Sequence, residues 1–142
     1  SPELLKVLAE MGHGDEIVIA DANFTAASLA VGKPIIRLPG ASVERASQAV
    51  LSLLALDAAV AQPVAFMQVS EYPAGTLSAL QRRMLAWLEQ AGHAEPAQCE
   101  ATERFAFYDR VRDAFAIVLT GELQPYGNFL YKKGVIGEAL VP

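Results

Sequence analysis

The feature that most constrains the fold is the short apolar run Ile17-Val18-Ile19, which lies between Glu16 and Ala20. Its β-branched residues favour a β-strand. Three consecutive apolar side chains alternate between the two faces of a sheet, so both faces must be buried. The rest of the chain must therefore supply helices for two covering layers.

Helical and extended patterns alternate along the chain. Helical spacing of apolar residues predicts helices over residues 1–11, 42–56, 77–91 and 103–113. Apolar or alternating runs predict strands over residues 16–20, 35–37, 64–69, 98–102, 115–119 and 128–132. We expect an α/β fold: a single three-layer domain over residues 1–142, with a mixed, mostly parallel sheet and helices on both faces.

Two further segments complete the prediction of local structure. Ser1 and Ser42 are suited to begin the first two helices as caps, and Gly12 and Gly92 to end the first and the third. Residues 21–34, which are rich in small and polar side chains, are expected to form one long loop.

Composition excludes one large class of function. The 142 residues carry a net charge of −5 and no basic stripe, whereas nucleic-acid binding depends on concentrated positive charge. Hydrophobic residues make up 53% of the chain, which is slightly above the usual share. We expect a chain with this much apolar surface to self-associate.

No segment has the pattern of a bilayer span or of a signal peptide. The most apolar stretch, residues 49–67, is interrupted by Ser52, Asp57, Gln62 and Pro63. The single Cys99 cannot form an internal disulfide, so a reducing, cytoplasmic setting is expected. The chain opens with a serine rather than a methionine, which leaves open a missing natural N-terminal piece or a removed leader.

Common signatures of cofactor and nucleophile chemistry are absent from the sequence. There is no GxGxxG after a strand, no GxxxxGK[ST] loop and no GxSxG elbow. No group of Cys and His residues has zinc spacing. We therefore expect neither a cofactor nor a metal site.

The segment around the first strand offers two candidate residues. His13 stands between Gly12 and Gly14, where it is either a helix-end residue or a general acid/base, since imidazole titrates near neutral pH. Asp21 follows the strand directly, where it is either the start of an Asx turn or a ligand-binding carboxylate. Both can share a pocket, although their spacing alone does not require it.

Two later segments carry further candidates. Arg104 and Tyr108 are four residues apart and can share a helix face, although a surface ion pair of Arg104 with a nearby glutamate is the plainer interpretation. Tyr126-Gly127-Asn128 combines a phenol, a backbone open to close approach and an amide, which suits a polyhydroxyl ligand. An ordinary turn is the alternative there.

Taken together, several blocks resemble one family. They are the residues 1–5 and 11–16, the Ala-Asp-Ala-Asn-Phe run at residues 20–24, the Glu-Arg-Phe-Ala-Phe-Tyr run at 103–108, and the segments 114–122, 126–128 and 132–135. They resemble the L-fucose mutarotase branch of the sugar mutarotase family, which also contains ribose pyranase. The resemblance spans nearly the whole chain and keeps the order of the blocks.

The resemblance implies specific roles. It implies a cofactor-free isomerase that interconverts the α and β anomers of a free sugar, most simply L-fucose, with His13 as catalytic acid/base. It implies that Asp21, Arg104 and the segment Tyr126, Gly127 and Asn128 bind the sugar. It also implies a homo-oligomer, commonly a ten-subunit ring, with sites near subunit contacts.

Two alternatives to a fucose mutarotase stay open. One is a pyranase-type exchange of pyranose and furanose forms of a ribose-like sugar, and the other is a non-catalytic sugar-binding protein. The chain departs from the family pattern at Thr25, where proline is common, and at Leu38-Pro39, where an Ala-Asp pair is expected. We expect these departures to affect which sugar is preferred, while they leave the expected catalytic residues in place.

Overall fold

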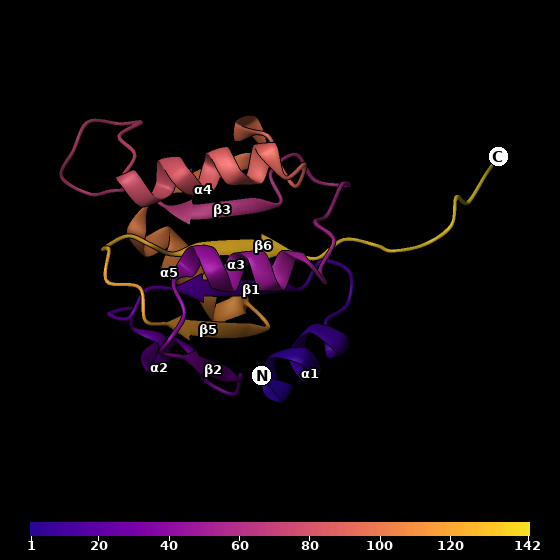
Figure 1. Ribbon diagram of the computed structural model, residues 1–142, viewed down its shortest axis with the longest axis horizontal. Coiled ribbons are helices and arrows are strands. Elements are labelled where there is room, and N and C mark those ends of the chain that lie inside the picture. The colour runs from indigo at the N-terminus through magenta and orange to yellow at the C-terminus, as the bar shows by residue number, and fades with distance from the viewer.

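A computed structural model describes residues 1–142. Its helices are α1 (Pro2–Glu10), α2 (Ala26–Leu29), α3 (Val43–Leu51), α4 (Ala79–Gln90) and α5 (Arg104–Asp113), with a short 3₁₀ turn at Pro96–Gln98. Its strands are β1 (Glu16–Ala20), β2 (Ile35–Leu38), β3 (Val64–Met67), β4 (Cys99–Thr102), β5 (Ala116–Thr120) and β6 (Phe129–Lys132). Figure 1 shows the strands side by side with helices around them.

The strands form one mixed sheet in the order β2-β5-β1-β6-β3-β4. Strand β1 pairs in parallel with β5, β5 with β2, and β3 with β4. Only β6 runs antiparallel, between β1 and β3. The prediction of a mixed, mostly parallel sheet is confirmed.

Apolar side chains on the two faces of the sheet form two separate cores. Ile17 and Ile19 pack in the larger core with residues of α1, α3 and α4. Val18 and Ala20 point the other way, into a core shared with α2 and α5. All four side chains are fully buried, so β1 is covered on both faces as its sequence predicts. The helices lie on both faces, which confirms the three-layer arrangement.

Two predictions of local structure were wrong. Residues 21–34 are not wholly loop, because Ala26–Leu29 form the four-residue helix α2. Such a short helix has too few residues for a periodic pattern, and it is stabilised by burying Ala26 and Leu29 against α5. The helix expected to reach residue 56 ends at Leu51, since Leu56 instead forms a β-bridge with Lys133 at the end of β6.

The sheet has two distinct ends. The carboxyl ends of the parallel strands lie together at the left of Figure 1, and the chain leaves β6 at the opposite end, where its C-terminal segment runs away from the sheet. Helix α5 is tied to the sheet by Arg110, whose guanidinium binds Glu16 at 2.6 Å and Glu100 at 3.0 Å. No helix combines the length and the apolar character that a bilayer span requires.

Candidate active site

A polar cluster occupies the carboxyl end of β1. Asp21 is buried, and its two carboxylate oxygens accept backbone N–H groups of Asn23 at 3.0 Å and Gly127 at 3.2 Å. The backbone N–H of Asp21 donates to the side-chain oxygen of Asn128 at 2.9 Å. The antiparallel register of β1 and β6 brings these residues together, because it continues past the pair Ile19 and Phe129. Residues more than a hundred positions apart therefore form one site.

Asp21 retains capacity to bind a ligand. A carboxylate offers about four acceptor positions, and backbone groups occupy two of them here. Burial raises the pKa of Asp21 above its usual value, whereas hydrogen bonds from Asn23, Gly127 and Asn128 lower it in part. Hydroxyl groups of a substrate can occupy the remaining acceptor positions. Their hydrogen bonds would replace those to water that the carboxylate loses on burial.

The backbone next to this carboxylate is held in a demanding conformation. Tyr126 has φ of 60°, in the left-handed region that side chains rarely adopt. Its carbonyl accepts a hydrogen bond from Gln81 of α4, which is fully buried and also binds the Met67 carbonyl at 2.8 Å. A Cβ on Gly127 would lie 2.8 Å from the Leu80 side chain, so any other residue there requires its neighbours to shift. Tight packing thus orients Tyr126 and Asn128.

Helix α5 supplies one wall of the site. Arg104 stands at its first turn and donates from Nε to the Tyr108 hydroxyl at 2.9 Å. The guanidinium also lies over the Tyr108 ring, and the hydrogen bond to the hydroxyl raises the pKa of Arg104 further above its usual value. Phe24 packs edge-on against Tyr108 at 5.7 Å between ring centroids. The wall therefore combines a fixed positive charge with aromatic faces.

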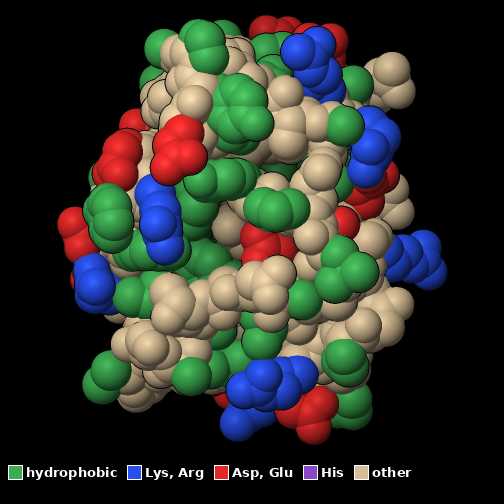
Figure 2. Space-filling view, turned by 90° about the vertical axis from the view of Figure 1, so that its left-hand side faces the viewer, with side chains coloured by type: hydrophobic (Ala, Val, Ile, Leu, Met, Phe, Trp, Pro, Cys, Tyr) green, Lys and Arg blue, Asp and Glu red, His purple; other side chains and the backbone are tan.

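These groups border one open hollow of about 270 Å³, hereafter called the sugar pocket because residues that are expected to bind a sugar line it. It is lined by Asp21, Asn23, Phe24, Met67, Arg104, Tyr108, Pro125, Tyr126 and Asn128. Pockets for drug-sized ligands span about 300–1,000 Å³, so this one suits a monosaccharide. Figure 2 looks onto this end of the molecule and shows acidic side chains among hydrophobic ones, with no histidine surface in view.

His13 does not lie in this pocket. It precedes β1, whereas Asp21 follows it, so the five-residue strand separates them by about 17 Å. His13 lines another hollow, which it shares with Leu56, Asp57 and Val135. The expectation that His13 and Asp21 can share a pocket is therefore wrong within a single chain. The other expected binding residues do lie together around the sugar pocket.

His13 has a partner that its sequence neighbourhood does not reveal. Its Nε2 lies 3.2 Å from the buried carboxylate of Asp57, which also accepts the Ala59 N–H at 3.0 Å. The Ala59 bond, and after it the contact with His13, lower the pKa of Asp57, so the carboxylate is ionised at neutral pH. An ionised carboxylate can only accept, so in a neutral imidazole Nε2 carries the proton and Nδ1 is the free acceptor.

The loop that holds His13 is fixed on both sides. Gly14 has φ of 87° and donates its N–H to the Lys133 carbonyl at 2.8 Å, while Asp15 accepts the Gly12 N–H at 2.7 Å. The imidazole remains half-exposed, with 53% of its side-chain surface accessible. It is a well-positioned group that faces outward at the opposite end of the sheet from the sugar pocket.

Sequence reasoning missed several site residues. The spacing of Tyr108 from Arg104 predicts a shared helix face but no pocket, and Phe24 and Met67 carry no polar signal. Asp57 looked like an interruption of an apolar stretch. A lone acid among apolar residues is a usable signal, since burial of a carboxylate needs a partner. No group of His, Cys, Asp or Glu side chains suited to a metal ion is present.

Comparison with known proteins identifies the family. A model of the RbsD / FucU transport protein family matches residues 1–136. The chain belongs to this family. The L-fucose mutarotase of Actinobacillus pleuropneumoniae is 46% identical over 136 residues, which cover 95% of this chain and 91% of the relative. The resemblance inferred from the sequence blocks is confirmed.

Solved structures of RbsD / FucU proteins share the fold. A fucose mutarotase from Streptococcus pneumoniae, in complex with L-fucose, matches with a TM-score of 0.83 and 38% identity, over 96% of this chain and 94% of that one. Bacillus subtilis RbsD, complexed with D-ribose, matches with a TM-score of 0.71 and 27% identity, over 96% and 95% of the two chains. The α/β architecture is therefore that of the family.

Proposed function

We propose that this chain is an isomerase that interconverts the α and β anomers of free L-fucose. The observation that carries the proposal is the sugar pocket, where Asp21, Arg104 and Asn128 converge on a space the size of one monosaccharide. The family membership supports the same activity, since fucose mutarotases are 44–47% identical over most of the chain. The likeness to RbsD, at 27% identity, favours the pyranase alternative less.

In the proposed binding mode, the sugar hydroxyls replace water on the polar wall. Asp21 accepts hydroxyl protons, and the Asn128 amide N–H₂ group, whose only contact is the Met67 sulfur at 3.8 Å, donates to a sugar oxygen. Arg104 donates from the opposite side. The aromatic faces of Phe24 and Tyr108 lie against the less polar face of the ring.

In the proposed reaction, one proton leaves the anomeric hydroxyl and another reaches the ring oxygen. The bond between C1 and the ring oxygen breaks, an open-chain aldehyde forms, and rotation about C1–C2 precedes closure on the other face. Nδ1 of His13 is the proposed acceptor of the first proton, and the Tyr126 hydroxyl donates the second to the ring oxygen. Ring closure returns both protons, so the cycle is neutral overall.

Because His13 and the sugar pocket lie at opposite ends of one chain, we propose that each site combines two copies. His13 with Asp57 comes from one copy, and the pocket comes from its neighbour. Each copy then supplies His13 and Asp57 to the site of one neighbour, and its own sugar pocket receives His13 and Asp57 from another neighbour. Repeated contacts of this kind form a closed homo-oligomeric ring. A cytoplasmic location is part of the same proposal and rests on the lone free Cys99.

Exchange NMR tests the activity directly. Saturating the α-anomeric proton of L-fucose should transfer to the β signal in the presence of the protein, and His13→Ala should slow this exchange by about 10²–10⁴-fold. Exchange into furanose signals of ribose alone would favour the pyranase alternative. Binding without any acceleration would refute both enzymatic functions.

Co-expression tests the shared site. His13→Ala and Arg104→Ala should each be impaired alone. In a random mixture, about a quarter of the sites join an intact His13 to an intact Arg104, so about a quarter of the activity should return. A mixture no more active than its components would show that one copy supplies both residues.

A further inference from the structure

The last residues of the chain form an apolar segment that stays largely exposed on its own domain. Val135, Ile136, Leu140 and Val141 are exposed, with at least 67% of each surface accessible. Beyond Gly134 the chain makes no backbone hydrogen bond, and Figure 1 shows it running away from the sheet. We call residues 135–142 the tail. Such exposure of clustered apolar side chains marks a surface that binds a partner.

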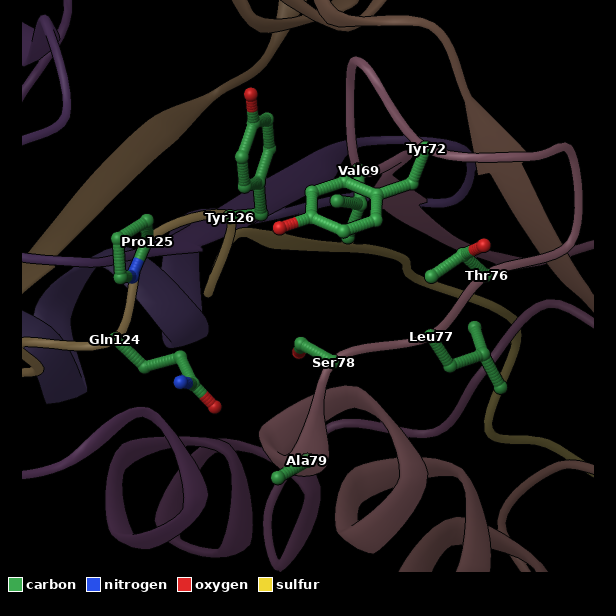
Figure 3. Close-up of a pocket in the computed structure, with 9 residues that line it drawn as sticks. All are labelled: Val69, Tyr72, Thr76, Leu77, Ser78, Ala79, Gln124, Pro125 and Tyr126. Atoms are coloured by element: carbon green, nitrogen blue, oxygen red, sulfur yellow. The ribbon is translucent and has the colours of Figure 1, made fainter.

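A second hollow lies beside the sugar pocket. It has a volume of about 380 Å³ and shares Pro125 and Tyr126 with the sugar pocket. Figure 3 shows Tyr72 and Leu77 on one side of it, Pro125 and Tyr126 on the other, and the start of α4 below. We call it the side pocket.

Two polar side chains of the side pocket are already bonded. The Ser78 hydroxyl accepts the Gln81 N–H at 3.1 Å, and the Gln124 side-chain oxygen accepts the Leu80 N–H at 3.0 Å. Both bonds cap the first turn of α4. The rest of the lining is mostly apolar or aromatic and suits an apolar side chain; it includes Val69, Tyr72, Leu77, Ala79, Pro125 and the ring of Tyr126.

We propose that the side pocket of one copy receives the tail of a neighbouring copy, with Ile136 as its first anchor. Ile136 lies two residues beyond Gly134, so it extends at most about 7 Å from that residue. The side pocket of its own copy lies at the opposite end of the sheet, which a five-residue strand such as β1 spans over about 17 Å. A second copy can bring the two ends together.

The layout of both ends favours this occupant. At the end of the sheet that carries the tail, Val135 lines the same hollow as His13 and Asp57. At the opposite end of the sheet, the side pocket and the sugar pocket share a wall. A tail seated in the side pocket therefore carries His13 to the neighbouring sugar pocket. This inference rests on the proposed two-copy site, and it names the contact that aligns it.

Disulfide trapping tests the contact independently of activity. Copies that carry Ile136→Cys are co-expressed with copies that carry Leu77→Cys, and the mixture is oxidised gently. The expected result is a covalent dimer on a non-reducing gel, which neither variant forms alone. The natural Cys99 is buried and does not interfere. Val31→Cys, at a site that is 87% exposed and does not line the side pocket, replaces Leu77→Cys as the matched control and should give no dimer.

Other outcomes identify other arrangements. A dimer of Leu77→Cys alone would place two side pockets face to face, and absence of a mixed dimer would leave the pocket to a soluble ligand; either result overturns the proposal. As a second measurement, Ile136→Asp should lower the sedimentation coefficient and reduce kcat/KM for fucose at least tenfold. Leu53→Asp, a comparable exposed site, should change neither. Fucose exchange by the unmodified protein shows separately whether the proposed activity holds.

Discussion

Replacing Gly127 with alanine should disturb the sugar pocket without adding or removing a polar group. The new Cβ would lie 2.8 Å from the Leu80 side chain, 3.0 Å from the Gln124 carbonyl oxygen and 3.3 Å from the Glu122 side chain. Leu80 is fully buried and the carbonyl belongs to the backbone, so neither neighbour can easily move away. The segment around residue 127 must shift instead.

The expected cost of this overpacking is about 1–3 kcal/mol of unfolding free energy. The shift also affects function. The Gly127 N–H reaches Asp21 at 3.2 Å, which is already a long hydrogen bond, and Tyr126 and Asn128 flank the displaced residue. Misplacement of binding groups by about 1 Å can cost about a hundredfold in rate. We therefore expect kcat/KM for fucose to fall by about ten- to a hundredfold.

Urea unfolding and anomer-exchange NMR measure the two effects, at equal protein concentration because the stability of the proposed oligomer would depend on it. Gly40→Ala is the matched control, since nothing lies within 4 Å of its added Cβ. It should stay within about 0.5 kcal/mol of the unmodified protein. If Gly127→Ala were as stable and as active as that control, close packing would not be what orients the Tyr126 to Asn128 segment.

Three further predictions concern charged groups. Asp57→Asn keeps an acceptor for Ala59 but loses the charge that holds His13, so kcat should fall about tenfold in exchange NMR while KM changes little; an unchanged kcat would remove Asp57 from the mechanism. Tyr108→Phe releases Arg104 from its hydrogen bond, so KM for fucose should rise several-fold, whereas an effect on kcat alone would contradict a binding role. Because burial raises the pKa of Asp21, the folded state binds its proton more tightly than the unfolded state does, and stability should fall as pH rises from 3.8 through that raised pKa. Urea titrations of Asp21→Asn, which cannot ionise, should lack this decline, and a wild-type decline that persists in the variant would assign it to another group.

The order and type of the main elements follow from local sequence. The apolar run of β1, the serine that begins α1 and the capping serine of α4 each act within a few residues of themselves. Their effects can therefore be predicted without knowing the rest of the chain. The four-residue helix α2 escaped prediction for the same reason, since its stability comes from burial against α5 and not from its own pattern.

What the sequence determined by itself is the α/β class and the burial of β1 on both faces, and it named the residues that we propose to bind a sugar. The tertiary structure decided which of these residues meet. The register of β1 against β6 joins Asp21 to Gly127 and Asn128 at one end of the sheet and ties the His13 loop to the base of the tail at the other. Strand pairing acts between segments more than a hundred residues apart, and no local pattern specifies it. The separation of His13 from the sugar pocket, and the need for a second copy that we infer from it, could therefore be seen only in the folded chain.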